Sequence, residues 1–421
     1  MSSYLDIREA LEETPCINGH LHQTSHEGEE FPSNGDALSY VSEYFHENMP
    51  GMGGFKWSGA SGREAWKLFL SAWPQLRCTG GGRVASAKLR RLGLSDDLTL
   101  ESYDEIPKRL RKHTPDEARN AYKHAGIRGS LTDVLGHPCF GGLKLLTEFL
   151  EGIYKPIDGF FPLLHTNDFH DINTPQEFQQ IEHVIGSEFH SLDDMKEKCC
   201  SLVQKAAKLG LVGLKDTRAY TRGVGYDAPD RGAAQAAFLR LRNGHNVPEG
   251  DNSLSNYMFD ALVACASDLG LTVAIHTGFI FSVNAKSNAN QLHNLIERFP
   301  NVRFDLYHLN YPWVDEIYYI LSQYQNTTAN CVWAEYIDPA GTEAFLYRCL
   351  GSLSANRVIA YGSDGGGLDF VLASLSLTKD LIAAALSRLV DRSQISKSSA
   401  LEVARIWLYE APVEAFKLKC D

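Results

Sequence analysis

The sequence of 421 residues lacks most features that mark a secreted, membrane-bound or disulfide-bonded protein. Its nine cysteines are scattered and odd in number, and no Cys-x-x-Cys pair occurs, a pattern typical of reduced thiols in a cytoplasmic protein. Residues 1–15 are polar and contain no apolar segment of the kind that a signal peptide needs. No apolar run approaches the roughly 20 residues that span a bilayer. We therefore expect a cytoplasmic protein with no membrane partner.

Runs of basic residues are absent as well. The formal net charge is −12, and Lys and Arg do not cluster along the chain. Because nucleic acids are bound by basic patches, we expect no nucleic-acid partner. Internal repeats and low-complexity segments are also lacking. A hydrophobic content of 44% with 22% charged residues is ordinary for a globular protein.

Short apolar runs alternate with amphipathic helical patterns over most of the chain. Met258, Leu262 and Leu269 fall on one face of a predicted helix that precedes the run LTVAIHTG. Eight runs are predicted to be strands: residues 16–22, 126–134, 157–166, 211–217, 271–278, 302–310, 327–336 and 357–367. Strands that alternate with helices form parallel sheets, so eight such units predict an α/β fold, a (β/α)8 TIM barrel. An open, doubly wound sheet is the alternative.

Two segments are too long for simple connections between neighbouring strands. Residues 23–122 contain Gly- and Ser-rich pieces that alternate with helical ones such as REAWKLFLSAW, and they predict a helical insertion after strand 1. Residues 217–255 form a second long loop after strand four. We interpret residues 1–421 as a single barrel domain that carries the insertion at 23–122.

Side chains able to bind a metal stand at the downstream ends of the predicted strands. His20 and His22 lie on the same face of the first strand, because successive side chains alternate. Strands three, four, five, six and eight end with His165, Lys215, His276, His308 and Asp364, respectively. In a (β/α)8 barrel these strand ends meet at one face, where active sites lie. The sequence therefore predicts that these side chains converge.

The residue types indicate a divalent cation. Imidazole nitrogens with one carboxylate are typical ligands of zinc, and they leave a coordination position for water. Such an ion lowers the pKa of its water to about 7 and supplies hydroxide. Asp364 can bind the metal and also move the water's proton. We expect one or two ions, most simply Zn2+; a second ion would use His276 and His308, with Lys215 carbamylated by CO2 as a bridge.

The order of these residues resembles that of the amidohydrolase superfamily. The segments HTGF, DLYHLNYPW and YGSDGG are similar to its amidohydrolase-related branch, which includes uronate isomerases and metal-dependent decarboxylases. GLKDTRAYTRG and VWAEY resemble predicted TIM-barrel metal-dependent hydrolases near the uronate isomerases. The resemblance covers residues 15–22 and about 126–421. The superfamily usually has Asp two residues before the first His, where this chain has Asn18; no ligand is lost by this change.

The resemblance implies that His20, His22 and Asp364 are metal ligands and that His276 is a further one. His308 is either a ligand or a residue that orients or polarises the bound group. Lys215 is a carbamylated bridge, an ammonium that contacts substrate, or the ion-pair partner of a carboxylate such as Asp216.

Other residues are candidates for binding substrate. Arg218 and Arg222 can clamp a substrate carboxylate through paired N–H bonds, or they are surface residues of a long loop. His165 either faces the site or caps a turn, and Trp313 belongs either to the pocket wall or to the core. Five further histidines are expected to be solvated: His26, His46, His113, His137 and His170.

We therefore predict a metal-dependent hydrolase in which a metal-bound hydroxide attacks an amide, lactone or related C–N or C–O bond of a small, acidic substrate. A uronate (sugar acid) isomerase or a metal-dependent non-oxidative decarboxylase is the alternative on the same site. A third alternative is a barrel that binds metal without turnover. A homodimer is compatible with a barrel of this size.

Overall fold

The computed structural model describes residues 3–22, 36–42, 59–278 and 285–420. Eight parallel strands form one sheet in the order of the chain. The strands are β1 (Cys16–Leu21), β2 (Ile127–Leu135), β3 (Phe160–His165), β4 (Gly213–Asp216), β5 (Thr272–His276), β6 (Phe304–Tyr307), β7 (Thr327–Asn330) and β8 (Val358–Ile359). The predicted (β/α)8 barrel is confirmed.

A backbone hydrogen bond joins the two ends of the sheet. The N–H of Gly19 in β1 donates to the carbonyl oxygen of Tyr361, just past β8, at 3.0 Å. A Cβ atom at position 19 would lie 2.7 Å from that oxygen. Only glycine therefore permits this approach, and it brings the first and last strands together.

Helices alternate with the strands. Those before β2 are α1 (Tyr4–Ala10), α2 (Ala37–Ser42), α3 (Gly62–Leu76), α4 (Gly80–Arg91), α5 (Ser102–Arg109) and α6 (Pro115–His124). Those between β2 and β6 are α7 (Gly142–Leu150), α8 (Asn167–His170), α9 (Pro175–Ile185), α10 (Leu192–Lys208), α11 (Arg231–Arg242), α12 (Ser253–Leu269) and α13 (His293–Arg298). Those after β6 are α14 (Val314–Gln323), α15 (Ala334–Ile337), α16 (Pro339–Cys349), α17 (Leu368–Asp391), α18 (Lys397–Arg405) and α19 (Ala411–Phe416).

The last three strands are shorter than the sequence predicts. A one-turn 3-10 helix follows β6, and helix α15 occupies the end of the segment predicted as strand seven. β8 holds two residues of the predicted 357–367, and the rest is loop up to α17. The apolar run is longer than the strand in each case, because apolar residues in the following loop are buried as well.

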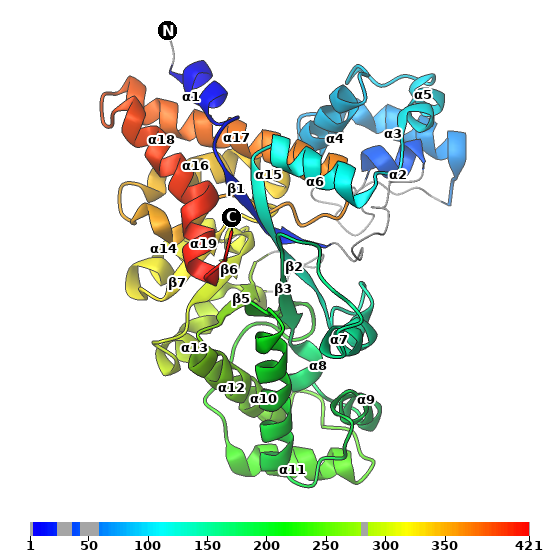
Figure 1. Ribbon diagram of the computed structural model, residues 1–421, viewed down its shortest axis with the longest axis vertical. Helices are drawn as coiled ribbons and strands as arrows, with labels where there is room; N and C mark the ends of the chain where they lie inside the picture. The colour runs from blue at the N-terminus through cyan, green and yellow to red at the C-terminus, as the bar shows by residue number, and fades with distance from the viewer. Residues whose placement is uncertain (1–2, 23–35, 43–58, 279–284, 421) are drawn as a thin grey trace.

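Described helices of the segment 23–122 pack around a hydrophobic cluster of their own. Trp66, Phe69 and Trp73 of α3 meet Leu89 of α4 and Ile106 of α5 in this cluster, apart from the main core. Helices α2 to α5 lie together beside the barrel, at the upper right of Figure 1. The helical character predicted for this segment is therefore present in its described part, and its status as an insertion in one domain stays a prediction.

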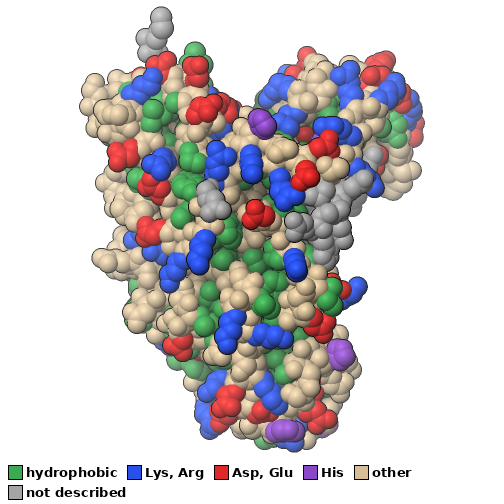
Figure 2. Space-filling model, viewed as in Figure 1, with side chains coloured by type: hydrophobic (Ala, Val, Ile, Leu, Met, Phe, Trp, Pro, Cys, Tyr) green, Lys and Arg blue, Asp and Glu red, His purple; other side chains and the backbone are tan. Residues whose placement is uncertain are grey.

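One described helix, α17, is long and apolar enough by length and composition to cross a membrane. This corrects the expectation that no apolar stretch approaches that length. Of its most apolar 18-residue window, 83% is buried inside the protein, as in the core helix of a globular fold. On the face shown in Figure 2, acidic and basic side chains are interspersed rather than gathered by sign.

Candidate metal centre

Three metal-capable side chains from opposite ends of the chain meet at the mouth of the barrel. His20 lies in β1, His22 follows it, and Asp364 follows β8. The Nε2 atoms of His20 and His22 each lie 3.0 Å from Oδ1 of Asp364. Within the described ranges, one ligand atom from each residue lies within 4.8 Å of the other two. The structure thus brings together the three ligands that the resemblance implies most directly.

A buried hydrogen-bond network holds these two segments together. Asn18 donates from Nδ2 to Oγ of Ser363 and accepts the N–H of Ser363 on Oδ1, both at 2.9 Å. The N–H of Asp364 donates to the carbonyl oxygen of His20 at 3.0 Å. An ionised Asp at position 18 could only accept. The side-chain amide of Asn18 is therefore both a donor and an acceptor, at a position where the superfamily usually has a carboxylate.

The electrostatics favour the metal-binding protonation states. Burial alone would raise the pKa of Asp364, but His20 and His22 hold that pKa well below its usual range. Burial, assisted by the positive charge of Lys215, lowers the pKa of His20 well below its ordinary value. The carboxylate is therefore ionised and the imidazole of His20 neutral at pH 7, the forms that bind a cation.

The three donors fit a divalent cation such as Zn2+. Two imidazoles and one carboxylate match the usual three protein ligands of a catalytic zinc site, with a position left open. Two ligands at about 2.0–2.2 Å from one ion lie at most about 4.4 Å apart. The separations of 3.0 Å between each Nε2 and Asp364 Oδ1 fall within that limit.

Backbone strain is concentrated at the same mouth. His308, Trp333 and Asp364 have φ angles of 67°, 58° and 55°, in the left-handed region that residues with a Cβ atom rarely adopt. They follow β6, β7 and β8, respectively, and all three line one cavity. Such strain persists where the surrounding structure enforces it, and it is common at functional sites.

That cavity has a volume of about 490 Å³. All seven polar residues predicted at the strand ends line it: His20, His22, His165, Lys215, His276, His308 and Asp364. His165 faces the cavity, and its Nε2 lies 2.6 Å from Oγ1 of Thr217. The convergence expected from the sequence is therefore present.

His276 and His308 lie beside the three donors and contact each other. Nδ1 of His276 lies 3.1 Å from Nε2 of His308, and Nδ1 of His308 lies 3.0 Å from the carbonyl oxygen of Val332. Among the residues that the structure describes, neither histidine is part of a three-residue donor group. Their roles as ligands stay a prediction.

Lys215 is buried at the end of β4, and its Nζ lies 3.6 Å from the centre of the Tyr307 ring. Burial lowers its pKa, against the attraction of Asp133 and Asp364. Asp216, suggested as an ion-pair partner, instead accepts the hydroxyl of Tyr226 at 2.8 Å. The carbamylated form of Lys215 stays a prediction.

Sequence analysis missed Asp133 and His137, which both line the cavity. Asp133 lies in β2, and its Oδ2 is 3.9 Å from Nε2 of His20. His137, expected to be solvated, is partly buried against the ring of His22. Asp133 stands near the end of predicted strand 126–134, so the rule applied to the other strands would have found it.

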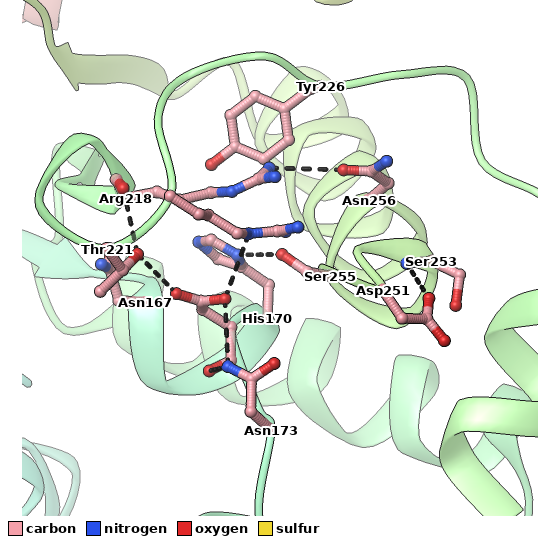
Figure 3. Close-up of polar contacts among 12 residues, drawn as sticks. Asn167, His170, Asn173, Arg218, Thr221, Tyr226, Asp251, Ser253, Ser255 and Asn256 are labelled. Carbon is pink, nitrogen blue, oxygen red and sulfur yellow. Dashed lines mark hydrogen bonds and ion pairs between the residues drawn. The ribbon is translucent and has the colours of Figure 1, made fainter. Parts of the chain in front are cut away.

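Arg218 and Arg222 are absent from the described lining of the cavity. Figure 3 shows Arg218 in a polar network with Tyr226 and Asn256. The guanidinium of Arg218 lies 4.1 Å from the centre of the Tyr226 ring, and Nη1 donates to Oδ1 of Asn256 at 3.4 Å. Nε of Arg222 lies 3.3 Å from Oδ1 of Asp171, whose carboxylate does line the cavity. Neither arginine is the solvated loop residue considered as the alternative.

His170 lies in the same network and is completely buried, so its expected solvation is wrong. Its Nδ1 lies 3.1 Å from Oγ of Ser255, and its Nε2 lies 3.3 Å from Oδ1 of Asp216. His113 is partly buried, and His26 and His46 lie outside the described residues. Trp313 is partly buried before α14 and is absent from the described cavity lining.

An eight-stranded parallel barrel with a His/His/Asp donor set at its mouth is the architecture of a metal-dependent (β/α)8 enzyme. A family model described as amidohydrolase matches residues 188–387. The resemblance to the amidohydrolase superfamily is thereby confirmed over this segment, which is a little under half of the chain. No curated protein matches the chain significantly.

Solved structures with the same fold cover the chain almost from end to end. A uronate isomerase from Thermotoga maritima is 15% identical, with a TM-score of 0.77, and the match covers 99% of this chain and 98% of that one. A glucuronate isomerase from Caulobacter crescentus is 17% identical, with a TM-score of 0.77 and coverage of 100% and 95%. A protein from Lactobacillus casei, provisionally assigned as a metal-dependent hydrolase, is 13% identical, with a TM-score of 0.61 and coverage of 98% and 97%. At these identities the likeness establishes the fold.

Proposed function

We propose that the protein is a metal-dependent hydrolase that cleaves an amide, lactone or related C–N or C–O bond of a small substrate bound in the cavity. The observation that carries the proposal is the approach of His20 Nε2 and His22 Nε2 to one carboxylate oxygen of Asp364, each at 3.0 Å. A divalent cation bound by these residues supplies Lewis acidity to a carbonyl oxygen and makes water acidic.

The remaining chemistry belongs to the side chains around the cation. Asp364 is ionised, so its carboxylate can take the proton of the attacking water and return it to the leaving group. Phe140 stacks on the His22 ring with 4.5 Å between ring centres, and Trp333 forms another part of the wall. Both rings add apolar surface to the wall beside the donors.

The charge of the cavity lining bears on the substrate. Its described residues include five carboxylates, Asp133, Asp168, Asp171, Glu177 and Asp364, and one ammonium group, Lys215. Arg222 lies 3.3 Å from Asp171, and a divalent cation would add two positive charges, so most of this negative charge is balanced. The lining is therefore compatible with the small, acidic substrate expected from the sequence, which we keep in the proposal.

Isomerisation of a sugar acid is the second candidate. The end-to-end likeness to the two isomerase structures favours it. It needs the same cation to stabilise an enolate-like intermediate but no net attack by water. The decarboxylase alternative from the sequence has no observation of its own in its favour.

One experiment separates these reactions. The purified protein is analysed for metal content and then tested on amides, lactones and uronates in water enriched in 18O. Hydrolysis adds the elements of water and places 18O in the new carboxylate, whereas isomerisation adds no water, although the carbonyl oxygen of a sugar exchanges with solvent. Conversion of a uronate to an isomer without addition of water would replace the proposal by the second candidate. Unchanged metal content and activity in Asp364→Asn would contradict both the hydrolase and the isomerase proposal.

A further inference from the structure

We infer that Asp133 is a fourth protein ligand of the cation held by His20, His22 and Asp364. The inference rests on the proposed function only in that it requires this cation. It adds a carboxylate from β2, a strand that supplies no ligand in the set expected from the sequence. The donor set then contains two imidazoles and two carboxylates, and the reacting water would bind as a fifth ligand, a coordination number that catalytic zinc also adopts.

The first argument is the state of the Asp133 side chain. It is 1% exposed and lines the cavity. Neither of its carboxylate oxygens has a hydrogen-bond partner within the described part of the chain. An ionised carboxylate buried without a partner costs several kcal/mol, roughly, so such groups are normally paired or bound to a metal. These oxygens are therefore expected to meet a group that enters the cavity.

The second argument is the position of that carboxylate relative to the other donors. Oδ2 of Asp133 lies 3.9 Å from His20 Nε2, the nitrogen that lies 3.0 Å from Asp364 Oδ1. Both carboxylates thus approach one imidazole nitrogen from different strands. A separation of 3.9 Å is inside the limit of about 4.4 Å for two ligands of one ion. Asp133 is not part of the group in which ligand atoms of His20, His22 and Asp364 all lie within 4.8 Å of one another. A rotation of its side chain would bring Oδ2 to a cation bound to His20.

A separate metal site at Asp133 is less consistent with the chemistry. Ligand atoms of Asp133, His22 and His137 also lie within 4.8 Å of one another. However, Nδ1 of His137 accepts the backbone N–H of Cys139 at 3.1 Å. A neutral imidazole that accepts on Nδ1 carries its proton on Nε2, so His137 has no lone pair left for a cation. His22, in turn, already contacts Asp364.

The test measures metal binding without any substrate. Metal-free wild-type protein and its Asp133→Asn variant are titrated with Zn2+ and, separately, with Co2+, whose visible absorption reports the number and type of its ligands. We expect one ion per chain in both proteins, an affinity lower in the variant by about 10- to 100-fold or more, and a changed Co2+ spectrum. Asp168→Asn removes another cavity carboxylate and is the matched control, expected to leave both readouts unchanged.

Two outcomes would overturn the inference. If Asp133→Asn binds both ions as the wild type does, the carboxylate serves a substrate group instead. If wild-type protein binds two ions per chain and Asp133→Asn binds one, Asp133 belongs to a separate site. Circular dichroism checks that metal-free Asp133→Asn is folded. If Asp133→Asn does not fold, Asp133→Ser is used in its place. Failure of the proposed hydrolysis would not affect this result, because it appears in the products and not in Zn2+ affinity. Absence of the cation site itself has a different signature, because Asp364→Asn would then leave Zn2+ affinity unchanged.

Discussion

Nδ1 of His276 lies 3.1 Å from Nε2 of His308, and the position of Val332 sets the direction of this hydrogen bond. The carbonyl oxygen of Val332 can only accept, so Nδ1 of His308 carries the proton when the ring is neutral. Burial lowers the pKa of His308 well below its ordinary value and keeps the ring neutral at pH 7. Nε2 of His308 is then the acceptor, Nδ1 of His276 donates, and Nε2 of His276 keeps its lone pair.

This chain of hydrogen bonds predicts the behaviour of His308 variants. His308→Ala removes the acceptor that orients His276, so kcat should fall by about 10- to 100-fold, while metal content stays near that of the wild type. His308→Gln offers a side-chain oxygen to His276 and should recover part of the activity. Elemental analysis alongside kinetics is the check; loss of the metal in both variants would instead make His308 a ligand.

Asn18 provides a prediction on stability. Asn18→Ala leaves the buried N–H of Ser363 without its acceptor and removes a second hydrogen bond to the same residue. The free energy of unfolding should fall by about 2–3 kcal/mol. Asn18→Asp keeps the acceptor and should cost less. Urea denaturation of metal-free protein measures both, because bound metal would add its own stabilisation. Equal stability of Asn18→Ala and wild type would contradict the role given to this network.

The parts of the molecule that the sequence predicts well are those set by local patterns. Alternating apolar runs and amphipathic helices specify the barrel, and strand ends of known direction place His165, His276 and Asp364 at one mouth. Asp133 obeys the same rule, but one carboxylate alone in a strand does not form a metal-binding pattern as two histidines on one face do.

The errors concern residues whose surroundings come from distant segments. His170 looks solvated in sequence, yet Ser255 and Asp216 reach it from α12 and β4. Arg218 lies in a long loop, yet its guanidinium donates to Asn256, which comes from α12. Tertiary partners of this kind leave no local periodicity, so burial of a polar side chain cannot be derived from its neighbours in sequence.

The network around Arg218 predicts that this residue stabilises the fold and does not bind substrate. Burial would raise the pKa of Asp216, but His170 and, to a smaller extent, the charge of Arg218 hold it below its ordinary value. Arg218→Met removes the hydrogen bond to Asn256 and a favourable charge near Asp216, so we expect a loss of about 1–3 kcal/mol in the free energy of unfolding. Arg218→Lys keeps the charge and should lose less.

Urea denaturation and steady-state kinetics together decide between the two roles of Arg218. The matched control is Arg63→Met, which removes an exposed arginine paired with Asp104 on the surface and should change stability by about 0–1 kcal/mol. A raised KM for Arg218→Met with wild-type stability would support the substrate clamp expected from the sequence and contradict the structural role.

The burial of Glu335 predicts that the stability of the protein depends on pH. Its side chain is buried in α15, and Oε1 accepts the hydroxyl of Ser374 at 2.6 Å. Burial raises its pKa from 4.5 to about 8, although the bond from Ser374 acts in the opposite direction. Between these two values the folded protein holds a proton that the unfolded chain has released. The contribution of this group is therefore fully present below pH 4.5 and is lost as the pH rises through 8.

Glu335→Gln removes this proton equilibrium and keeps a neutral side chain of similar shape. Relative to wild type, the variant should gain about 2–4 kcal/mol in the free energy of unfolding between pH 5 and pH 8.5, because it has no buried carboxyl group to ionise. Urea denaturation at intervals of one pH unit measures the difference, with the exposed Glu402→Gln as matched control. A difference between wild type and Glu335→Gln that does not vary with pH would show that Glu335 is not held protonated in the folded protein.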